Sequence, residues 1–223
     1  MDSATISDAF AAVQEKLKAA AATAGRTEQD VTLIAVSNQQ QDDRIDASLA
    51  TGHRIFGENR VQEAKTRWTE RKVLYPDLCL HLIGPLQSNK TVEAVRLFDV
   101  IHTVDRPKIA TAIAAEADKQ QKQIECFIQV NTGGEPQKSG IAPGELSDFL
   151  AFCRTQAGLS VKGLMCIPPI EEEAAMHFAL LKTLADRHEL ASLSMGMSGD
   201  YEEAVGFGAT HVRVGSALFG ARV

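Results

Sequence analysis

Two short segments near the end of the chain carry the residues best suited to hold a phosphate. SMGMSGD places Ser198 and Gly199 at the entry to a predicted helix, and VRVGSALFG places Gly215 and Ser216 in a second turn. A helix start exposes backbone amides without partners, and two such clusters side by side suit a phosphate. In the structural alternative, the glycines only permit tight turns and the serines only cap helices.

Three further polar residues are candidates for the same site. Arg213 precedes Gly215 by two residues and therefore shares its face of a predicted strand, where a buried guanidinium would need a ligand or a structural acceptor. Asn59, in FGENRVQEA, follows another predicted strand and is either a helix N-cap or a ligand contact. Lys138, in the NTGGEPQKSG loop, is either a surface charge or an amine at the rim of the site.

The sequence offers no support for metal or hydrolytic chemistry. It contains neither an HExxH pattern nor a GxSxG turn, and its six histidines are dispersed over predicted strands and helices.

The order of elements predicts how these residues are positioned. Eight short apolar runs are separated by polar stretches with helical periodicity: VTLIAVS, RIFGEN, CLHLIGP, VIHTVD, CFIQVN, VKGLMCI, SLSMGM and THVRVGSALFG. Such alternation indicates buried parallel strands, and eight units favour a closed (β/α)8 TIM barrel, an α/β fold, over an open doubly wound sheet. Barrels of this kind bind phosphate in the loops after strands seven and eight. We expect one domain over residues 1–223, with an N-terminal helix within 1–25 and the barrel over 31–220.

Composition narrows the class of partner. A hydrophobic fraction of 44% and a formal charge of -6 are typical of a globular protein and give no basic surface for nucleic acid. The four cysteines form no CxxC pair, and no signal peptide or membrane-spanning run is present in the sequence. We therefore expect a cytoplasmic protein that handles small molecules.

Taken together, these segments resemble the pyridoxal-phosphate homeostasis protein family, single-domain relatives of the alanine racemase barrel. The resemblance spans nearly the whole chain: LIAVS, HRIFGENRVQEA, HLIGPLQSNK, VNTGGEPQKSG, VKGLMCIPP, LSMGMSGDYEEA and THVRVGSALFG occur in the family's order and spacing. It implies that Ser198, Gly199, Gly215 and Ser216 hold the phosphate of pyridoxal 5′-phosphate. It also implies that Arg213 faces the pyridine nitrogen and that Asn59 lies near the ring.

The chain departs from the family at the end of the first predicted strand. The resemblance implies a lysine in an AVSK motif, which forms a Schiff base with the cofactor aldehyde, but this chain reads AVSN and has Asn38 there. An amide nitrogen is not a usable nucleophile, so covalent attachment at this position is excluded. Phosphate contacts of about 1.5–3 kcal/mol each still predict reversible binding, weaker than in relatives with the lysine. Asn38 can hydrogen-bond the aldehyde or its hydrate, or simply close the strand, and Lys138 is the alternative amine.

Three functions follow from this resemblance. The first is a monomeric, non-catalytic protein of pyridoxal phosphate homeostasis, with cofactor-dependent enzymes as recipients. The second is a racemase-like enzyme, which the missing lysine and the absence of a second domain disfavour. The third is a barrel that has lost cofactor binding and acts as a regulatory partner.

Overall fold

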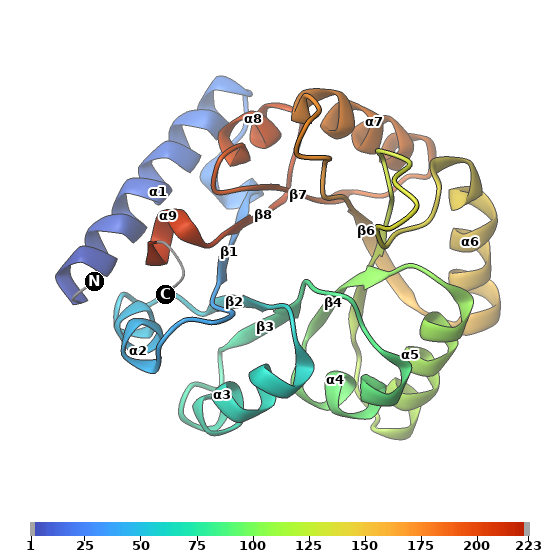
Figure 1. The fold of residues 1–223 in the computed structure, drawn as a ribbon, viewed down its shortest axis with the longest axis horizontal. Coiled ribbons are helices and arrows are strands. Elements are labelled where there is room, and N and C mark those ends of the chain that lie inside the picture. Colours follow the sequence, from blue (N-terminus) through green and yellow to red (C-terminus); the bar gives the residue numbers. More distant parts are fainter. Residues whose placement is uncertain (1–2, 221–223) are drawn as a thin grey trace.

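Eight parallel strands close into a barrel in the computed structural model, which describes residues 3–220 (Figure 1). Each strand pairs with the next, and β8 pairs with β1. The strands are β1 (Thr32–Val36), β2 (Ile55–Glu58), β3 (Cys79–Leu82), β4 (Val100–Val104), β5 (Glu125–Gln129), β6 (Ser160–Met165), β7 (Ser192–Met197) and β8 (His211–Val214). Each strand overlaps one of the eight predicted runs, and β5 and β6 begin one residue earlier than predicted. The closed barrel is confirmed and the open-sheet alternative is wrong.

Helices surround the barrel (Figure 1). They are α1 (Ser3–Thr23), α2 (Asp42–Ala50), α3 (Val61–Leu74), α4 (Thr91–Leu97), α5 (Pro107–Lys119), α6 (Leu146–Phe152), α7 (Ala174–Arg187), α8 (Tyr201–Gly206) and α9 (Ser216–Phe219). The predicted N-terminal helix is confirmed as α1, which lies against α2, α8 and α9 through a buried stripe that includes Ile6 and Phe10. No helix within residues 3–220 has the length and apolar character needed to cross a bilayer.

The apolar core has two parts. The larger lies between strands and helices and includes Trp68 and Phe56, whose ring centroids are 4.6 Å apart. The smaller lies inside the barrel, where Val100, Phe127 and Met165 form a separate cluster. Because side chains alternate across each strand, the inner face carries its own set of residues. That inner face ends at the rim where the site lies.

Candidate functional site

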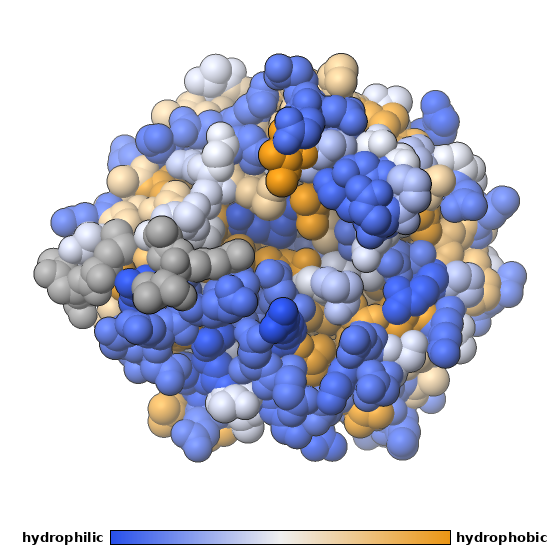
Figure 2. All heavy atoms as spheres, viewed as in Figure 1, coloured by the Kyte–Doolittle hydropathy of each residue, from blue (hydrophilic) through white to orange (hydrophobic). Residues whose placement is uncertain are grey.

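A cavity of about 530 Å³ opens at the carboxyl ends of the strands. Its lining residues are Val36, Gln40, Asn59, Ile83, Ile167, Met197, Ser198, Gly199, Arg213, Gly215, Ser216 and Gly220. Six of the seven residues predicted from the sequence are in this set. The seventh, Asn38, is buried between two lining residues, Val36 and Gln40. Figure 2 shows the molecule in space-filling form, with hydrophilic residues over most of the visible face and hydrophobic side chains in the recess near its centre.

The two predicted phosphate turns lie side by side. The Ser198 hydroxyl oxygen, after β7, accepts hydrogen bonds from the backbone amides of Gly215 (3.1 Å) and Ala217 (3.3 Å), after β8. Ser198 does not cap its own helix, because the N-cap residue of α8 is Asp200. The amides of the second turn therefore converge on the serine of the first. An anion that shares this position could accept from both turns.

The glycines of these turns have different roles. Gly196 has a φ of +90°, and a Cβ there would lie 2.6 Å from the Ala204 side chain, so the turn into α8 requires glycine. A Cβ at Gly199 would meet nothing within 4 Å, and one at Gly215 would approach Val36 to 3.4 Å. A tight turn therefore explains the glycine at position 196. It does not explain Gly199, which leaves open space beside the cavity.

Arg213 is a buried cation whose direct hydrogen-bond partners are neutral. It is 4% exposed, and its guanidinium donates to the Ser194 hydroxyl (2.7 Å) and to the Cys166 carbonyl (2.9 Å). Burial lowers its pKa, and within residues 3–220 no carboxylate forms an ion pair with it. Burying a positive charge without a carboxylate partner costs free energy of folding. The remaining N–H groups of Arg213 lie at the cavity. An electron-rich or anionic ligand would relieve that cost.

A column of polar residues inside the barrel supports Arg213, and the sequence reasoning did not anticipate it. His102 lies 2.9 Å from the Ser194 hydroxyl through Nδ1 and 2.8 Å from His81 Nδ1 through Nε2, and His81 Nε2 lies 3.3 Å from the Cys79 sulfur. Because Arg213 can only donate, the Ser194 hydroxyl oxygen accepts from it. A chain of hydrogen-bonding groups thus runs from Arg213 through Ser194, His102 and His81 to Cys79.

The imidazoles of this column are neutral, and so is that of His211, whose ring centroid lies 6.1 Å from that of His81 and 5.9 Å from that of His102. Desolvation by burial is the main cause that lowers the pKa of His81 to about 3 and of His211 to about 4, and it lowers the pKa of His102 well below the usual value. His102 also stacks on Phe127, with ring centroids 4.4 Å apart. Three histidines that are distant in the sequence therefore meet within the barrel, although no cluster of metal-binding geometry occurs among the described residues.

The end of β1 is rich in hydrogen-bond acceptors. Asn38 is 5% exposed, and its Oδ1 atom is buried without a hydrogen-bond partner. Its neighbour Ser37 donates to Glu58 Oε1 (2.8 Å), which also accepts from Arg67 and Trp68, while Glu58 Oε2 is buried and unpartnered. These contacts connect the end of β1 to β2 and α3. They leave the amide oxygen of Asn38 without a donor.

Two sequence expectations need comment. The interpretation of Asn59 as a helix N-cap is wrong, because α3 begins at Val61 with Arg60 as its N-cap residue, and Asn59 lines the cavity instead. Lys138 lines an adjoining cavity of about 230 Å³, which shares Ile83 and Ile167 with the main one, and its ammonium lies 2.5 Å from a Glu135 carboxylate oxygen. Lys138 is thus near the predicted site and already paired.

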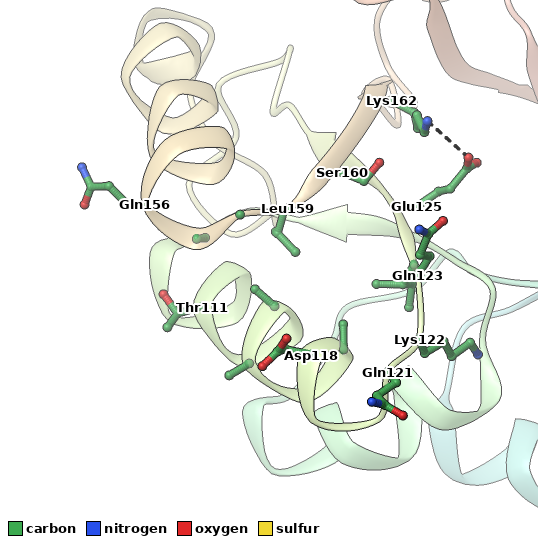
Figure 3. Close-up of a pocket in the computed structure, with 16 residues that line it drawn as sticks. Thr111, Asp118, Gln121, Lys122, Gln123, Glu125, Gln156, Leu159, Ser160 and Lys162 are labelled. Carbon is green, nitrogen blue, oxygen red and sulfur yellow. Dashed lines mark ion pairs between the residues drawn. The ribbon is translucent and has the colours of Figure 1, made fainter.

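A second large hollow, of about 880 Å³, lies away from these residues (Figure 3). It is bordered by the starts of β5 and β6, where Glu125 and Lys162 form an ion pair of 3.6 Å, and by the end of α5. The candidate site lies at the opposite ends of the strands. None of the residues predicted to do chemistry lines this hollow.

Comparison with known proteins agrees with the fold. Residues 11–223 match the family described as alanine racemase, N-terminal domain. A pyridoxal phosphate homeostasis protein of Pseudomonas aeruginosa is 42% identical over 223 residues, with 98% of this chain and 96% of the relative covered. The protein of the same name from Escherichia coli K12 is 37% identical over 222 residues, covering 96% and 95%.

Solved structures extend the comparison. PipY of Synechococcus elongatus, in a structure with pyridoxal phosphate bound, superposes with a TM-score of 0.82 at 35% identity, covering 96% of this chain and 100% of PipY. Alanine racemase of Bartonella henselae shares the fold, with a TM-score of 0.75 at 17% identity over 60% of its length. The chain therefore belongs to the pyridoxal phosphate homeostasis proteins, a branch of the alanine racemase N-terminal-domain family.

Proposed function

We propose that this chain binds pyridoxal 5′-phosphate reversibly and without a covalent bond, as a single-domain protein of cofactor homeostasis. The observation that carries the proposal is the buried Arg213 guanidinium, which has no carboxylate partner among residues 3–220 and faces a cavity. The amides of Gly215 and Ala217 converge on the Ser198 hydroxyl oxygen, and Ser198 and Gly215 line the same cavity. A ligand that carries both a phosphate and a ring nitrogen matches this pair of features. The names of the relatives and the ligand of PipY support the same assignment.

The residues present fit this cofactor. Ser198, Gly199, Gly215 and Ser216 would hold the phosphate through backbone amides and hydroxyls, and Arg213 would donate to the pyridine nitrogen. The cofactor, when bound, supplies a reactive aldehyde and a ring that can accept electrons. Asn38 supplies no amine to that aldehyde, and its buried Oδ1 atom lacks a donor.

The same residues favour binding over catalysis. A donor at the pyridine nitrogen disfavours protonation of that nitrogen, which weakens the ring as an electron sink. The Ser194 hydroxyl and the Cys166 carbonyl accept hydrogen bonds from Arg213 and hold its guanidinium in place. We infer that the chain has no turnover of its own and that it acts as a cytoplasmic monomer that supplies cofactor-dependent enzymes.

The test is a titration of the purified chain with pyridoxal 5′-phosphate, followed by borohydride reduction and intact-mass measurement. We expect saturable binding that is lost on dialysis, and no stoichiometric mass increase after reduction. A Lys138→Arg variant is the matched control, because it keeps the charge that pairs with Glu135 and removes the amine that lines the adjoining cavity. Absence of saturable binding would refute the proposal. A stoichiometric adduct in the parent chain that disappears in Lys138→Arg would refute its non-covalent part.

A further inference from the structure

Gln40 lies on the wall of the cavity, in the loop that follows β1. It is 7% exposed, and it lines the cavity together with Gly215 and Ser216 of the second phosphate turn. Its backbone amide donates to the Ser37 carbonyl (3.1 Å), and its backbone carbonyl accepts from Arg67 (3.1 Å). Both polar groups of the Gln40 backbone are therefore satisfied, which leaves the side chain to meet a ligand.

Arg44 determines which end of the Gln40 side chain meets the cavity. Its Nη1 atom lies 3.1 Å from Gln40 Oε1 and 3.0 Å from the Phe219 carbonyl oxygen. Because a guanidinium can only donate, the amide oxygen of Gln40 faces Arg44 and the NH2 group faces the other way. Within residues 3–220 no protein group accepts from this Nε2 atom, which nevertheless retains accessible surface. Its two N–H donors are thus open to a ligand in the cavity that Gln40 lines.

These donors lie on the phosphate side of the cavity. β1 pairs with β8 up to the residue before Gly215, and a Cβ at Gly215 would lie 3.5 Å from the Val36 carbonyl oxygen. The Arg44 atom that binds Gln40 also binds the last residue of α9. That helix has four residues, a length of about 6 Å, and Gly215 is its N-cap residue. The second phosphate turn is therefore close to Gln40.

A phosphate in these turns would meet a further pair of donors at Gln40. The turns themselves offer backbone amides and serine hydroxyls, which are neutral. Arg44 is a cation, and among the side chains of residues 3–220 no carboxylate forms an ion pair with it. A positive charge bound to the oxygen of an amide polarises that amide and strengthens its N–H groups as donors.

We propose that Gln40 donates a hydrogen bond to the phosphate of the bound cofactor and that Arg44 is a positioning residue that orients the Gln40 amide. This inference rests on the proposed function, because it assumes the phosphate position given there. It adds a contact from the loop after β1 to those from the turns after β7 and β8.

Titrations with pyridoxal 5′-phosphate and with inorganic phosphate test the proposal. Gln40→Met removes the donors at similar volume and should weaken both ligands by the same factor of about ten, because each loses a hydrogen bond to a charged group. Gln40→Glu keeps the shape of the side chain and gains an ion pair with Arg44. It should be at least as stable as the parent to urea, yet bind both ligands more weakly than Gln40→Met, because the carboxylate repels the phosphate. A purely structural role predicts normal binding by Gln40→Glu.

Gln41→Met is the matched control, because Gln41 is an exposed neighbour that does not line the cavity and makes no side-chain bond to the start of α2. Both affinities of this variant should stay within about twofold of the parent values. Arg44→Met should weaken both ligands by itself and have no further effect in the Gln40→Met background, because Arg44 acts through Gln40. Urea unfolding confirms that each variant is folded, and Gln40→Glu carries the test if Gln40→Met does not fold.

Three results would overturn the inference and leave the proposed function intact. They are parent-like binding of both ligands by Gln40→Met or Gln40→Glu, weaker binding of pyridoxal phosphate without weaker binding of inorganic phosphate, and an additive loss in the double variant. Failure of the parent to bind pyridoxal phosphate saturably would instead overturn the proposed function.

Discussion

Replacing the buried guanidinium with an apolar side chain separates ligand binding from folding. Arg213→Met removes two hydrogen bonds, to the Ser194 hydroxyl and the Cys166 carbonyl, but it also removes a buried charge that has no carboxylate partner within residues 3–220. These effects oppose each other, so we expect stability to change by no more than about 2 kcal/mol. Loss of one charge-assisted contact to the ligand, about 1.5–3 kcal/mol, weakens binding roughly 10- to 150-fold.

The assay is a fluorescence titration with pyridoxal 5′-phosphate, paired with urea unfolding of the same preparations. Arg213→Lys is the companion variant, because it keeps a positive charge without the planar fork, and we expect its affinity to lie between those of the parent and Arg213→Met. The reasoning is refuted if folded Arg213→Met binds within about twofold of the parent. It is equally refuted if the variant loses far more stability than affinity.

Three further predictions concern the covalent position, the phosphate turn and the interior histidines. Asn38→Lys should gain a borohydride-stable adduct at residue 38, whereas neither it nor the parent should racemise amino acids; cofactor-dependent turnover by either chain would contradict the non-catalytic assignment. Ser198→Ala should weaken binding of inorganic phosphate and of the cofactor by a similar factor of about five to ten, and competition titrations that showed loss for only one of them would place the phosphate elsewhere. His81 and His211 stay neutral in the folded chain down to about pH 3 and 4, whereas unfolded histidines take up protons below about pH 6.5. The stability that depends on these neutral histidines is therefore fully present above about pH 6.5. As the pH drops toward 4, the free energy of unfolding falls by roughly 1 kcal/mol per histidine per pH unit. Urea unfolding across this range should show a shallower slope for His81→Asn, and an identical slope would count against the neutral column.

Much of the fold could be predicted because its signals are local. Each strand is a continuous apolar run, and each turn after β7 and β8 carries its own glycine and serine. The order of runs and helices then determines which turns meet at one rim, so Ser198 and Gly215 were placed together correctly.

The remaining features depend on contacts across the barrel. His81, His102 and Ser194 lie on different strands, and their meeting depends on register, which one strand's sequence does not specify. The helix N-cap alternative for Asn59 is wrong, because the helix that follows begins at Val61, one residue later than that alternative requires.

A crystal structure of the chain soaked with pyridoxal 5′-phosphate tests the central claim most directly. We predict electron density for the phosphate against the amides of the turns at Ser198 and Gly215, with the ring nitrogen at Arg213 and no continuous density to any lysine. Turns that hold only solvent at saturating ligand, or a ligand joined covalently to Lys138, would contradict the account.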